Sequence, residues 1–275
     1  MKRIDLHVHT TASDGTVTPS EAVLLAKNVG LSAIAICDHD TAEGVAGAIS
    51  AGKEQGVEVV PGIEISLDYK GHGIHLLGYF IDPCSPALRQ LLAWVIEERK
   101  RRNQLILDAM RADGIGISFD WLEERFPGAV IGRPHFAAAL AERGMAQSVD
   151  DAFRRYLSRG CRYYRKREYI PMDKAFEVIR AAGGKAVFAH PLQYRFPEDE
   201  LLALTRLLAD RGAVGMECLY SGYTDEQIDR LRSIAGRFGL CVTGGSDFHG
   251  SRKPHIPMGS DREIPYELLE KLKER

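Results

Sequence analysis

Cysteine is scarce in this 275-residue chain, and none of it occurs in pairs. The five cysteines stand singly, without a CxxC spacing, at positions Cys37, Cys84, Cys161, Cys218 and Cys241. A small disulfide-stapled secreted domain needs an even set of closely spaced cysteines, so the sequence excludes that class. Isolated thiols are typical of a reducing compartment, and we therefore expect a cytoplasmic protein.

Long apolar runs and an excess of one charge are absent as well. No stretch approaches the roughly 18 apolar residues of a membrane span, and Asp5, His7 and His9 interrupt any apolar signal-peptide core. Lysine and arginine total 36 against 38 acidic residues, which gives a formal net charge of −2. The chain therefore has no overall basic field for duplex DNA or a membrane surface, and any attraction for phosphate must be local.

Short β-branched runs alternate with helical patterns in both outer parts of the chain. The pattern predicts strands at 2–9, 31–37, 57–66, 74–81, 185–189, 213–219 and 240–245, and helices at 19–28, 42–55, 172–182, 198–211 and 225–238. This rhythm is typical of a parallel sheet with helices around it. We predict an α/β protein, in which residues 1–82 and 171–275 form one TIM-like barrel.

The middle of the chain, residues 83–170, has helical periods and almost no strand signal. Its first helix is expected to begin at Ser85-Pro86 and to end near Arg111, with further helices at 118–126, at 134–143 and after Ser148. We interpret this segment as a helical insertion that caps the barrel and contacts the substrate.

Histidines and carboxylates recur at or near the ends of the predicted strands. Nine of them form the candidate set: His7, His9, Asp14, His39, Glu64, His75, His190, Asp247 and His249. The C-terminal ends of barrel strands converge on one mouth, so residues far apart in sequence would meet there. Imidazoles with carboxylates suit Mn, Fe or Zn, and this set suffices for two or three divalent ions. Asp38 and Asp40 are candidates for orienting the ring nitrogens of these ligands.

Basic residues of the insertion indicate a second site for anions. On the long first helix the apolar stripe continues into Arg99 and Arg102, with Asn103 beside them. Buried arginines need anionic partners, which are either protein carboxylates or a bound phosphate. Arg133 and His135 open a later helix, whose free backbone N–H groups also attract anions. We interpret these five residues as substrate contacts, and the basic stretch at 162–167 as a connector back to the barrel.

Six short motifs resemble the successive motifs of the PHP (polymerase and histidinol phosphatase) superfamily. They are DLHVHTTASDG, ICDHD, PGIEIS, the GIHLLGYF around His75, the AHP around His190, and GGSDFHG. The resemblance implies a distorted (β/α)7 barrel with three metal sites. It assigns the ligands as follows: His7, His9, Glu64 and Asp247 to one site, Glu64, His75 and His190 to a second, and Asp14, His39 and His249 to a third.

The same resemblance implies a metal-dependent phosphatase or phosphodiesterase. The residues expected to carry catalysis are His7, His9, Glu64, Asp247 and His249, with Mn²⁺ as the expected metal and Zn²⁺ or Fe²⁺ as alternatives. The insertion resembles that of the small-nucleotide branch, which includes 3′,5′-nucleoside-bisphosphate phosphatases and the 5′-to-3′ exoribonuclease ribonuclease AM.

Membership of that branch implies hydrolysis of the 3′-phosphate ester of a nucleoside 3′,5′-bisphosphate, which yields the 5′-monophosphate. Short 5′-phosphorylated RNA is the second expected substrate, so small nucleotides or short RNA are the expected partners. Three alternatives remain at this point: a histidinol-phosphate phosphatase, a C–N amidohydrolase, and a metal-stabilised scaffold without activity. The complete ligand set argues against the scaffold.

Overall fold

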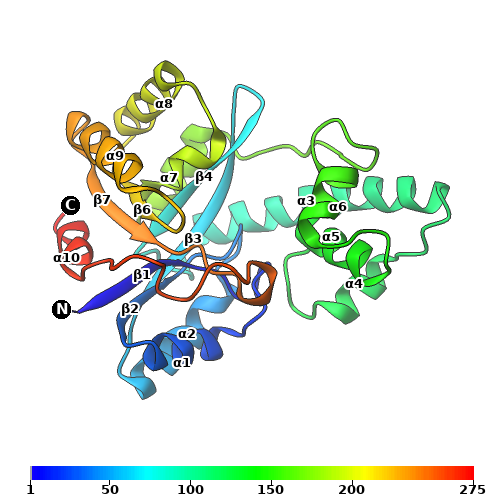
Figure 1. Ribbon diagram of the computed structural model, residues 1–275, viewed down its shortest axis with the longest axis horizontal. Helices are drawn as coiled ribbons and strands as arrows, with labels where there is room; N and C mark the ends of the chain where they lie inside the picture. The colour runs from blue at the N-terminus through cyan, green and yellow to red at the C-terminus, as the bar shows by residue number, and fades with distance from the viewer. Residues whose placement is uncertain (1) are drawn as a thin grey trace.

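A single seven-stranded sheet forms the body of the molecule in the computed structural model, which describes residues 2–275. The strands neighbour one another in chain order and curve into a nearly closed barrel (Figure 1). Their bounds are β1 (Arg3–Val8), β2 (Leu31–Ile36), β3 (Glu58–Tyr69), β4 (His72–Tyr79), β5 (Lys185–Phe188), β6 (Ala213–Tyr220) and β7 (Cys241–Gly245). The predicted α/β barrel and its seven strands are therefore confirmed.

The two edges of the sheet meet just beyond β7. His9 N donates a hydrogen bond to Phe248 O at 2.9 Å, and Phe248 N donates one to His7 O at 3.2 Å. These bonds join the end of β1 to the segment that follows β7. The closure therefore brings the first and last groups of predicted metal ligands side by side.

The direction of β4 differs from the parallel rhythm that the sequence predicts. β4 pairs antiparallel with both β3 and β5, whereas the other neighbours are parallel. The reason is local, because only Lys70 and Gly71 separate β3 from β4. Both residues have positive φ, 51° and 82°, as a two-residue hairpin turn requires, and so short a connection permits only antiparallel pairing.

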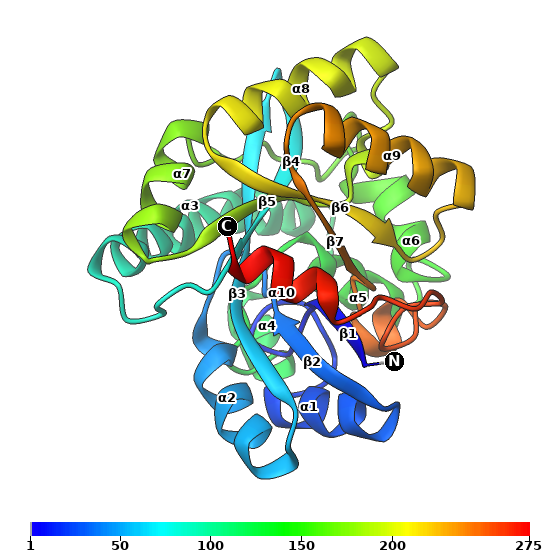
Figure 2. The same ribbon diagram turned by 90° about the vertical axis from the view of Figure 1, so that its left-hand side faces the viewer.

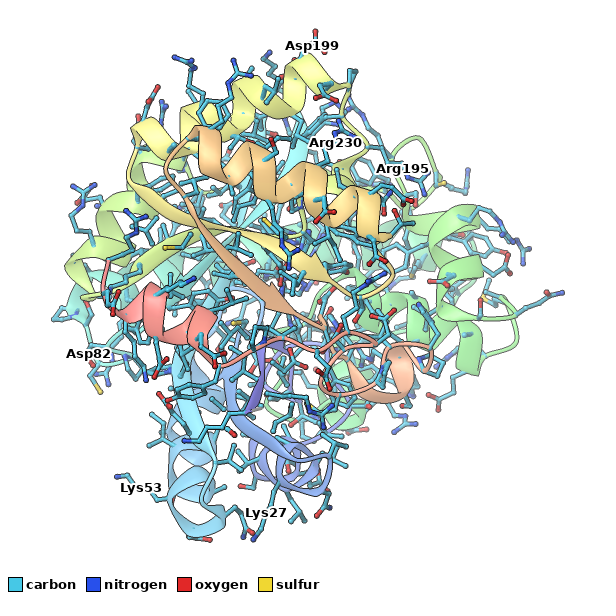
Figure 3. All side chains as sticks on the ribbon, turned by 60° about the vertical axis from the view of Figure 1, so that its left-hand side comes forward. Lys27, Lys53, Asp82, Arg195, Asp199 and Arg230 are labelled. Atoms are coloured by element: carbon cyan, nitrogen blue, oxygen red, sulfur yellow. The ribbon has the colours of Figure 1, made fainter. Side chains whose placement is uncertain are left out.

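Helices cover the outside of the barrel, and a last helix lies across one end of it (Figure 2). Those that pack on the strands are α1 (Pro19–Asn28), α2 (Glu43–Gln55), α7 (Met172–Ala181), α8 (Glu198–Asp210), α9 (Asp225–Arg237) and α10 (Glu267–Lys273), with short 3₁₀ turns η2 (Pro191–Tyr194) and η3 (Gly250–Arg252). Charged side chains such as those of Lys27, Lys53 and Asp199 extend from the outer helices into solvent (Figure 3).

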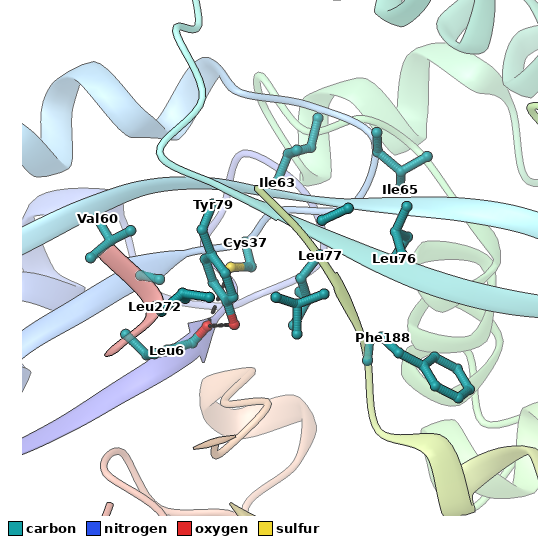
Figure 4. Close-up of a cluster of buried hydrophobic side chains, with 14 of the residues drawn as sticks. Leu6, Cys37, Val60, Ile63, Ile65, Leu76, Leu77, Tyr79, Phe188 and Leu272 are labelled. Carbon is teal, nitrogen blue, oxygen red and sulfur yellow. Dashed lines mark hydrogen bonds between the residues drawn. The ribbon is translucent and has the colours of Figure 1, made fainter. Parts of the chain in front are cut away.

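Large apolar side chains fill the barrel interior. Leu6, Ile63, Leu77 and Phe188 are fully buried in this core, and Leu272 of α10 is fully buried with them (Figure 4). Tyr79 is also fully buried, and its hydroxyl donates a hydrogen bond to Leu6 O at 2.7 Å. Because apolar side chains fill the interior, the polar groups collect at the end of the barrel that lies away from α10.

The insertion forms a cap beside the barrel with an apolar core of its own (Figure 1). Its elements are α3 (Pro86–Ala112), α4 (Phe119–Arg125), α5 (Arg133–Glu142), α6 (Val149–Ala152) and the π-helical turn η1 (Phe153–Leu157). The first half of α3 packs on the barrel through Leu88 and Val95, and the second half packs in the cap through Ile106 and Met110. Among residues 2–275, no helix combines the length and apolar character needed to cross a membrane.

Candidate metal centre

Nine polar side chains from several strands and loops converge at one end of the barrel. We call them the ligand cluster: His7 in β1, His9 and Asp14 after it, His39 after β2, Glu64 in β3, His75 in β4, His190 after β5, and Asp247 and His249 after β7. They form four overlapping groups in which the nitrogen and oxygen atoms lie within 4.8 Å of one another. These are the nine residues that the sequence analysis selected as metal ligands.

Glu64 lies in the middle of the ligand cluster and is fully buried. Its Oε1 lies 2.8 Å from His75 Nδ1 and 2.8 Å from His190 Nε2. Its Oε2 lies 2.9 Å from His39 Nδ1 and 3.3 Å from His9 Nε2. Because the two oxygens of one carboxylate face two sets of imidazoles, Glu64 has the geometry of a ligand shared between neighbouring ions.

Asp247 contacts the ligand cluster with only one of its oxygens. Asp247 Oδ1 lies 3.2 Å from His9 Nε2 and 3.7 Å from His7 Nε2. The other oxygen accepts hydrogen bonds of 2.6 Å from Lys253 Nζ and 2.6 Å from Tyr220 OH. These two donors hold Asp247 so that a single oxygen remains for an ion.

Asp14 is the carboxylate of a further group of ligands within the ligand cluster. Its Oδ1 lies 3.4 Å from His249 Nε2 and 3.7 Å from His9 Nδ1, and its Oδ2 lies 4.0 Å from His39 Nε2. The structure therefore brings together each of the three ligand sets implied by the sequence motifs. His9 adjoins both the first and the third set, and His39 adjoins Glu64 as well as Asp14.

The donor chemistry of the ligand cluster fits divalent metal ions. His9 Nδ1 and Glu64 Oε2 are buried atoms without a hydrogen-bond partner among residues 2–275. Leaving buried lone pairs unsatisfied is costly, and a cation of the Mn, Fe or Zn type binds both imidazole nitrogen and carboxylate oxygen. The ligand cluster thus offers the donor types and the unsatisfied lone pairs that such ions would use.

Burial and mutual contacts set the charges in the ligand cluster. Burial by itself raises the pKa of Glu64, but the surrounding histidines hold that pKa well below its usual range. Burial lowers the pKa of His75 to about 4 and that of His249 to about 4. Burial also disfavours the charged form of His9, but Asp247 and Glu64 outweigh it and raise the pKa of His9 to about 9. Ionised Glu64 and the neutral rings of His75 and His249 are forms that bind metals, whereas the raised pKa of His9 means that a metal ion has to displace a proton from this ring.

The backbone is strained at two residues of the ligand cluster. His190 has a φ of 28° and Asp247 a φ of 60°, values that L-residues rarely adopt. Such strain persists only where the surrounding structure holds it, and it is concentrated at functional sites. It lets the chain turn directly after β5 and β7, so that both side chains point back to the barrel mouth.

Glu217 is a functional residue that the sequence analysis missed. It lies in β6, is fully buried, and its Oε1 is 3.0 Å from His7 Nδ1. Its Oε2 accepts a hydrogen bond from the backbone N–H of His190 at 2.8 Å. The available signal was a single charged residue within the apolar strand Gly215-Met-Glu-Cys-Leu, since a buried charge requires a partner.

The predicted role of Asp38 and Asp40 is wrong, because neither contacts a histidine ring in the described part of the chain. Asp38 accepts hydrogen bonds from Thr10 N at 2.7 Å and Ser13 Oγ at 2.5 Å, and so shapes the loop before Asp14. Asp40 accepts a hydrogen bond from Ser66 N at 3.0 Å and pairs with arginines of the insertion, as described below. Glu217 is the carboxylate that orients a ring.

A cavity of about 540 Å³ extends from the ligand cluster to the insertion. On the barrel side Asp14, His39 and His75 line it. Six arginines also line it: Arg99, Arg102, Arg133, Arg159, Arg165 and Arg167. We call it the arginine cavity, and it brings a concentration of positive charge next to the candidate metal site.

Two arginines of the arginine cavity share one carboxylate. Arg99 Nη2 donates to Asp40 Oδ2, and Arg167 Nη2 donates to the same oxygen at 2.9 Å. Arg167 lies in the 162–167 segment that the sequence analysis interprets as a connector. Arg99 therefore pairs with a protein carboxylate. The other partner that its predicted burial allows is a bound phosphate.

Arg102 is held differently, although it lies one turn further along α3. Its Nε donates a hydrogen bond to Asn103 Oδ1 at 2.9 Å, and Asn103 Nδ2 donates to Ile131 O at 2.9 Å. Only 5% of Arg102 is exposed, and within residues 2–275 it forms no ion pair with a carboxylate. Burial and the charges of Arg99 and Arg133 lower the pKa of Arg102 well below its usual range. Asn103 holds Arg102 through this hydrogen bond and does not itself line the arginine cavity.

Arg133 and His135 stand at the start of α5, where the sequence analysis expected them. The Arg133 guanidinium lies over the rings of Tyr164 and Phe153, at 5.6 and 6.0 Å from their centroids. His135 Nδ1 accepts a hydrogen bond from Gly132 N at 2.9 Å. Both side chains line the arginine cavity, so four of the five predicted substrate residues border it.

A barrel with clustered imidazoles and carboxylates at its mouth is typical of metal-dependent hydrolases. The PHP domain family matches residues 5–158, more than half of the chain, and the chain belongs to this family. It is 38% identical to a 5′-3′ exoribonuclease of Haemophilus influenzae over 90% of each chain. It is 31% identical to a 3′,5′-nucleoside bisphosphate phosphatase of Chromobacterium violaceum, over 96% of this chain and 93% of the relative.

A solved structure from Bifidobacterium adolescentis, whose name assigns it to the metal-dependent phosphoesterases, has the same fold. It superimposes with a TM-score of 0.88 at 32% identity and covers 98% of this chain and 95% of its own. The chain is therefore an enzyme, a metal-dependent phosphoesterase. The predicted family and enzyme class are confirmed, and the scaffold alternative is excluded.

Proposed function

We propose that this enzyme hydrolyses the 3′-phosphate ester of nucleoside 3′,5′-bisphosphates and also removes nucleotides from the 5′ end of short 5′-phosphorylated RNA. The observation that carries the proposal is the buried Arg102 guanidinium, which faces the arginine cavity without a carboxylate partner. An unpaired buried charge is expensive, so a site that retains one must be completed by an anion. A terminal 5′-phosphate supplies that anion.

The lining of the arginine cavity favours a substrate with two phosphates. Asp14, His39 and His75 of the candidate metal site border this cavity, and so do Arg102 and Arg133 of the insertion. A nucleoside 3′,5′-bisphosphate has one phosphate for each region, with the sugar between them. Histidinol phosphate has a single phosphate and would leave Arg102 unpaired.

The residues of the chain have distinct tasks in this scheme. Divalent metal ions, when bound by the ligand cluster, supply Lewis-acid charge that activates water and stabilises the leaving oxygen. We expect two or three ions, with Mn²⁺ as the first candidate. Glu64 and Asp247 remain ionised and balance the cationic charge, and Glu217 fixes the His7 ring. Arg102 and Arg133 hold the 5′-phosphate, which positions the 3′ ester at the metal site.

The proposal agrees with the activities for which both types of relative are named. One relative is a 5′-3′ exoribonuclease and another is a 3′,5′-nucleoside bisphosphate phosphatase. Both activities break the bond between a 3′ oxygen and phosphorus next to a nucleotide that carries a 5′-phosphate. A single 5′-phosphate site beside one metal centre serves both.

The test compares two substrates on wild type and on Arg102→Met and Arg133→Ala. Each charge-assisted contact to phosphate contributes about 1.5–3 kcal/mol, so kcat/KM for adenosine 3′,5′-bisphosphate should fall by roughly ten- to a hundredfold. Hydrolysis of adenosine 3′-monophosphate should change little, because it has no 5′-phosphate. Arg125→Ala, which removes an exposed arginine of the cap, is the matched control and should leave both rates unchanged.

Stability measurements separate a binding role from a structural one. Arg102→Met replaces an unpaired buried charge by an apolar side chain of similar length, so the free energy of unfolding should stay level or rise. A variant that is destabilised and loses both substrates equally would mean that Arg102 serves the fold. Wild type that prefers histidinol phosphate to the bisphosphate would contradict the proposed function itself.

A further inference from the structure

A second cavity, of about 390 Å³, adjoins the segment of chain that follows Asp247 and His249. Its walls come from the loop after β6, the segment after β7, and the start of α6 in the cap. Gln193, Ser221, Arg252, Lys253 and His255 provide most of its polar groups. We call it the second cavity, and none of the predicted substrate residues borders it.

Asp247 connects the second cavity to the ligand cluster. Tyr220 and Lys253 line the second cavity, and both donate hydrogen bonds to Asp247 Oδ2. The other oxygen of the same carboxylate faces His9 at 3.2 Å. One carboxylate therefore separates the second cavity from the candidate metal site, while the arginine cavity adjoins that site through Asp14, His39 and His75.

Arg252 extends between the two cavities. It lines the second cavity, and its guanidinium lies over the Phe126 ring at 5.0 Å from the centroid. After burial, the charge of Arg252 is the largest influence that lowers the pKa of His135, which lines the arginine cavity. Arg252 Nη1 is buried without a hydrogen-bond partner among residues 2–275. This unsatisfied donor belongs to a side chain that borders the second cavity.

The charge of the second cavity differs from that of the arginine cavity. Asp150 and Asp261 line it together with Arg252, Lys253 and His255, so carboxylates and cations are interspersed. A terminal phosphate with two negative charges would be repelled by the carboxylates. A nucleoside brings sugar hydroxyls and base N–H groups that can donate to carboxylates, and hydroxyl oxygens and base lone pairs that can accept from cations. The volume of the second cavity is sufficient for one such unit.

We propose that the second cavity is a subsite for the nucleoside attached on the 3′ side of the scissile phosphate of an oligoribonucleotide. This inference rests on the proposed function, because it assumes that the preceding nucleotide lies in the arginine cavity. Water attacks phosphorus, the bond from phosphorus to the 3′ oxygen breaks, and that oxygen takes up the proton. The nucleotide in the second cavity keeps the phosphate and leaves as the new 5′-phosphorylated end.

The experiment compares adenosine 3′,5′-bisphosphate with the 5′-phosphorylated dinucleotide pApA. The variants are Gln193→Ala, His255→Ala and their combination, all in exposed side chains of the second cavity. Each lost hydrogen bond should lower kcat/KM for pApA by about three- to tenfold, whereas the value for the bisphosphate should remain within about twofold. Arg206→Ala, in an exposed arginine of α8, is the control for a general loss of positive charge.

The outcomes distinguish this inference from the proposed function. A selective loss on pApA supports the subsite, and a loss on pApA that is matched by Arg206→Ala overturns it. Equal losses on both substrates, or no loss on either, would likewise overturn the subsite while leaving the proposed function intact. Wild type that cleaves the bisphosphate but not pApA would overturn the subsite together with the proposed activity on RNA, and would leave only the proposed phosphatase activity standing. Wild type that cleaves neither nucleotide would overturn both.

Discussion

His135 is a buried histidine whose charge state is determined by its neighbours. Its Nδ1 accepts a hydrogen bond from Gly132 N, and its Nε2 is buried without a partner among residues 2–275. The ring lies 4.7 Å from the ring of Phe126, measured between centroids. Burial, followed by the charge of Arg252, lowers the pKa of His135 to about 3. The neutral ring, with its proton on Nε2, is therefore the form that the folded protein accommodates.

This shift predicts a pH dependence of stability with a definite sign. The pKa of His135 is lower in the folded protein than in the unfolded chain, where it is about 6.5, so the unfolded chain takes up the proton first as the pH falls. The buried His135 therefore lowers the free energy of unfolding only below about pH 6.5, and this loss reaches about 2 kcal/mol at pH 5.

The measurement is denaturant unfolding at pH 7 and pH 5, in chelator, for wild type and His135→Asn. Asparagine keeps an acceptor for Gly132 N but does not titrate. The variant should lose less stability than wild type between the two pH values, and parallel losses would show that His135 does not titrate as described.

Individual residues of the candidate site could be selected from the sequence, but the partners of its buried charges could not. The nine ligands could be selected because their spacing relative to strand ends is visible in the sequence. The partner of a buried charge is not visible, since it depends on which loops meet. Asp40 was therefore assigned to histidine rings, whereas it pairs with Arg99 and Arg167 from outside the barrel.

At the scale of elements, the contact between β7 and β1 leaves no room for a side chain. A Cβ added to Gly245 would lie 2.3 Å from His7 Cβ and 2.6 Å from His7 N. The glycine is required here for close approach of two strands rather than for an unusual φ. The position of His7, and with it the first ligand set, depends on this contact.

Gly245→Ala should therefore push β7 away from β1. We expect a loss of about 1–3 kcal/mol in the free energy of unfolding, the range for overpacked cores, together with weaker retention of metal. Gly236→Ala is the control, because a Cβ at this helical position in α9 meets nothing within 4 Å and alanine is the better helix former.

Unfolding curves and elemental analysis of the purified proteins give both quantities. The control should be stabilised, by no more than about 1 kcal/mol, and keep its metal. Full metal content and normal stability in Gly245→Ala would contradict the close-contact argument.

Element positions followed from local patterns, and the error in strand direction also has a local cause. The helices of the insertion begin and end within a few residues of the predicted positions, because capping residues and glycines mark them. The turn at Lys70 and Gly71 was not recognised, since neither residue is part of a strong hairpin dipeptide. The direction of β4 followed from that turn alone.

At the scale of the whole molecule, a buried ionic contact helps to join the cap to the barrel. Asp40, which is fully buried, belongs to the barrel, and its partners Arg99 and Arg167 belong to the inserted segment. Beyond Arg167 the returning chain pairs with β3 through Ile170 and Leu67. The Asp40 contact therefore holds the inner wall of the arginine cavity against the barrel.

Asp40→Asn should leave two buried arginines without a counter-charge. Removal of one partner from a buried ion pair costs about 3–5 kcal/mol, and we expect a loss of that size in the free energy of unfolding. Glu142→Gln is the matched control, because it removes an exposed ion pair with Arg125 inside the cap and should cost less than about 1 kcal/mol. Similar small losses in both variants would mean that the Asp40 contact does not hold cap and barrel together.

The helix α3 has a consequence for how such caps can vary. It spans 27 residues without interruption, a length of about 40 Å, and one continuous buried stripe serves the barrel wall first and the cap afterwards. Insertion of a single residue near its middle would rotate the distal half by about 100°, and Arg102 would point away from the arginine cavity. Changes in the length of this helix are therefore tolerated only in steps that restore its phase, such as seven or eleven residues. The loops after α3 are free of that restriction. Their lengths can change to accommodate substrates of different size while the phase of α3 is kept.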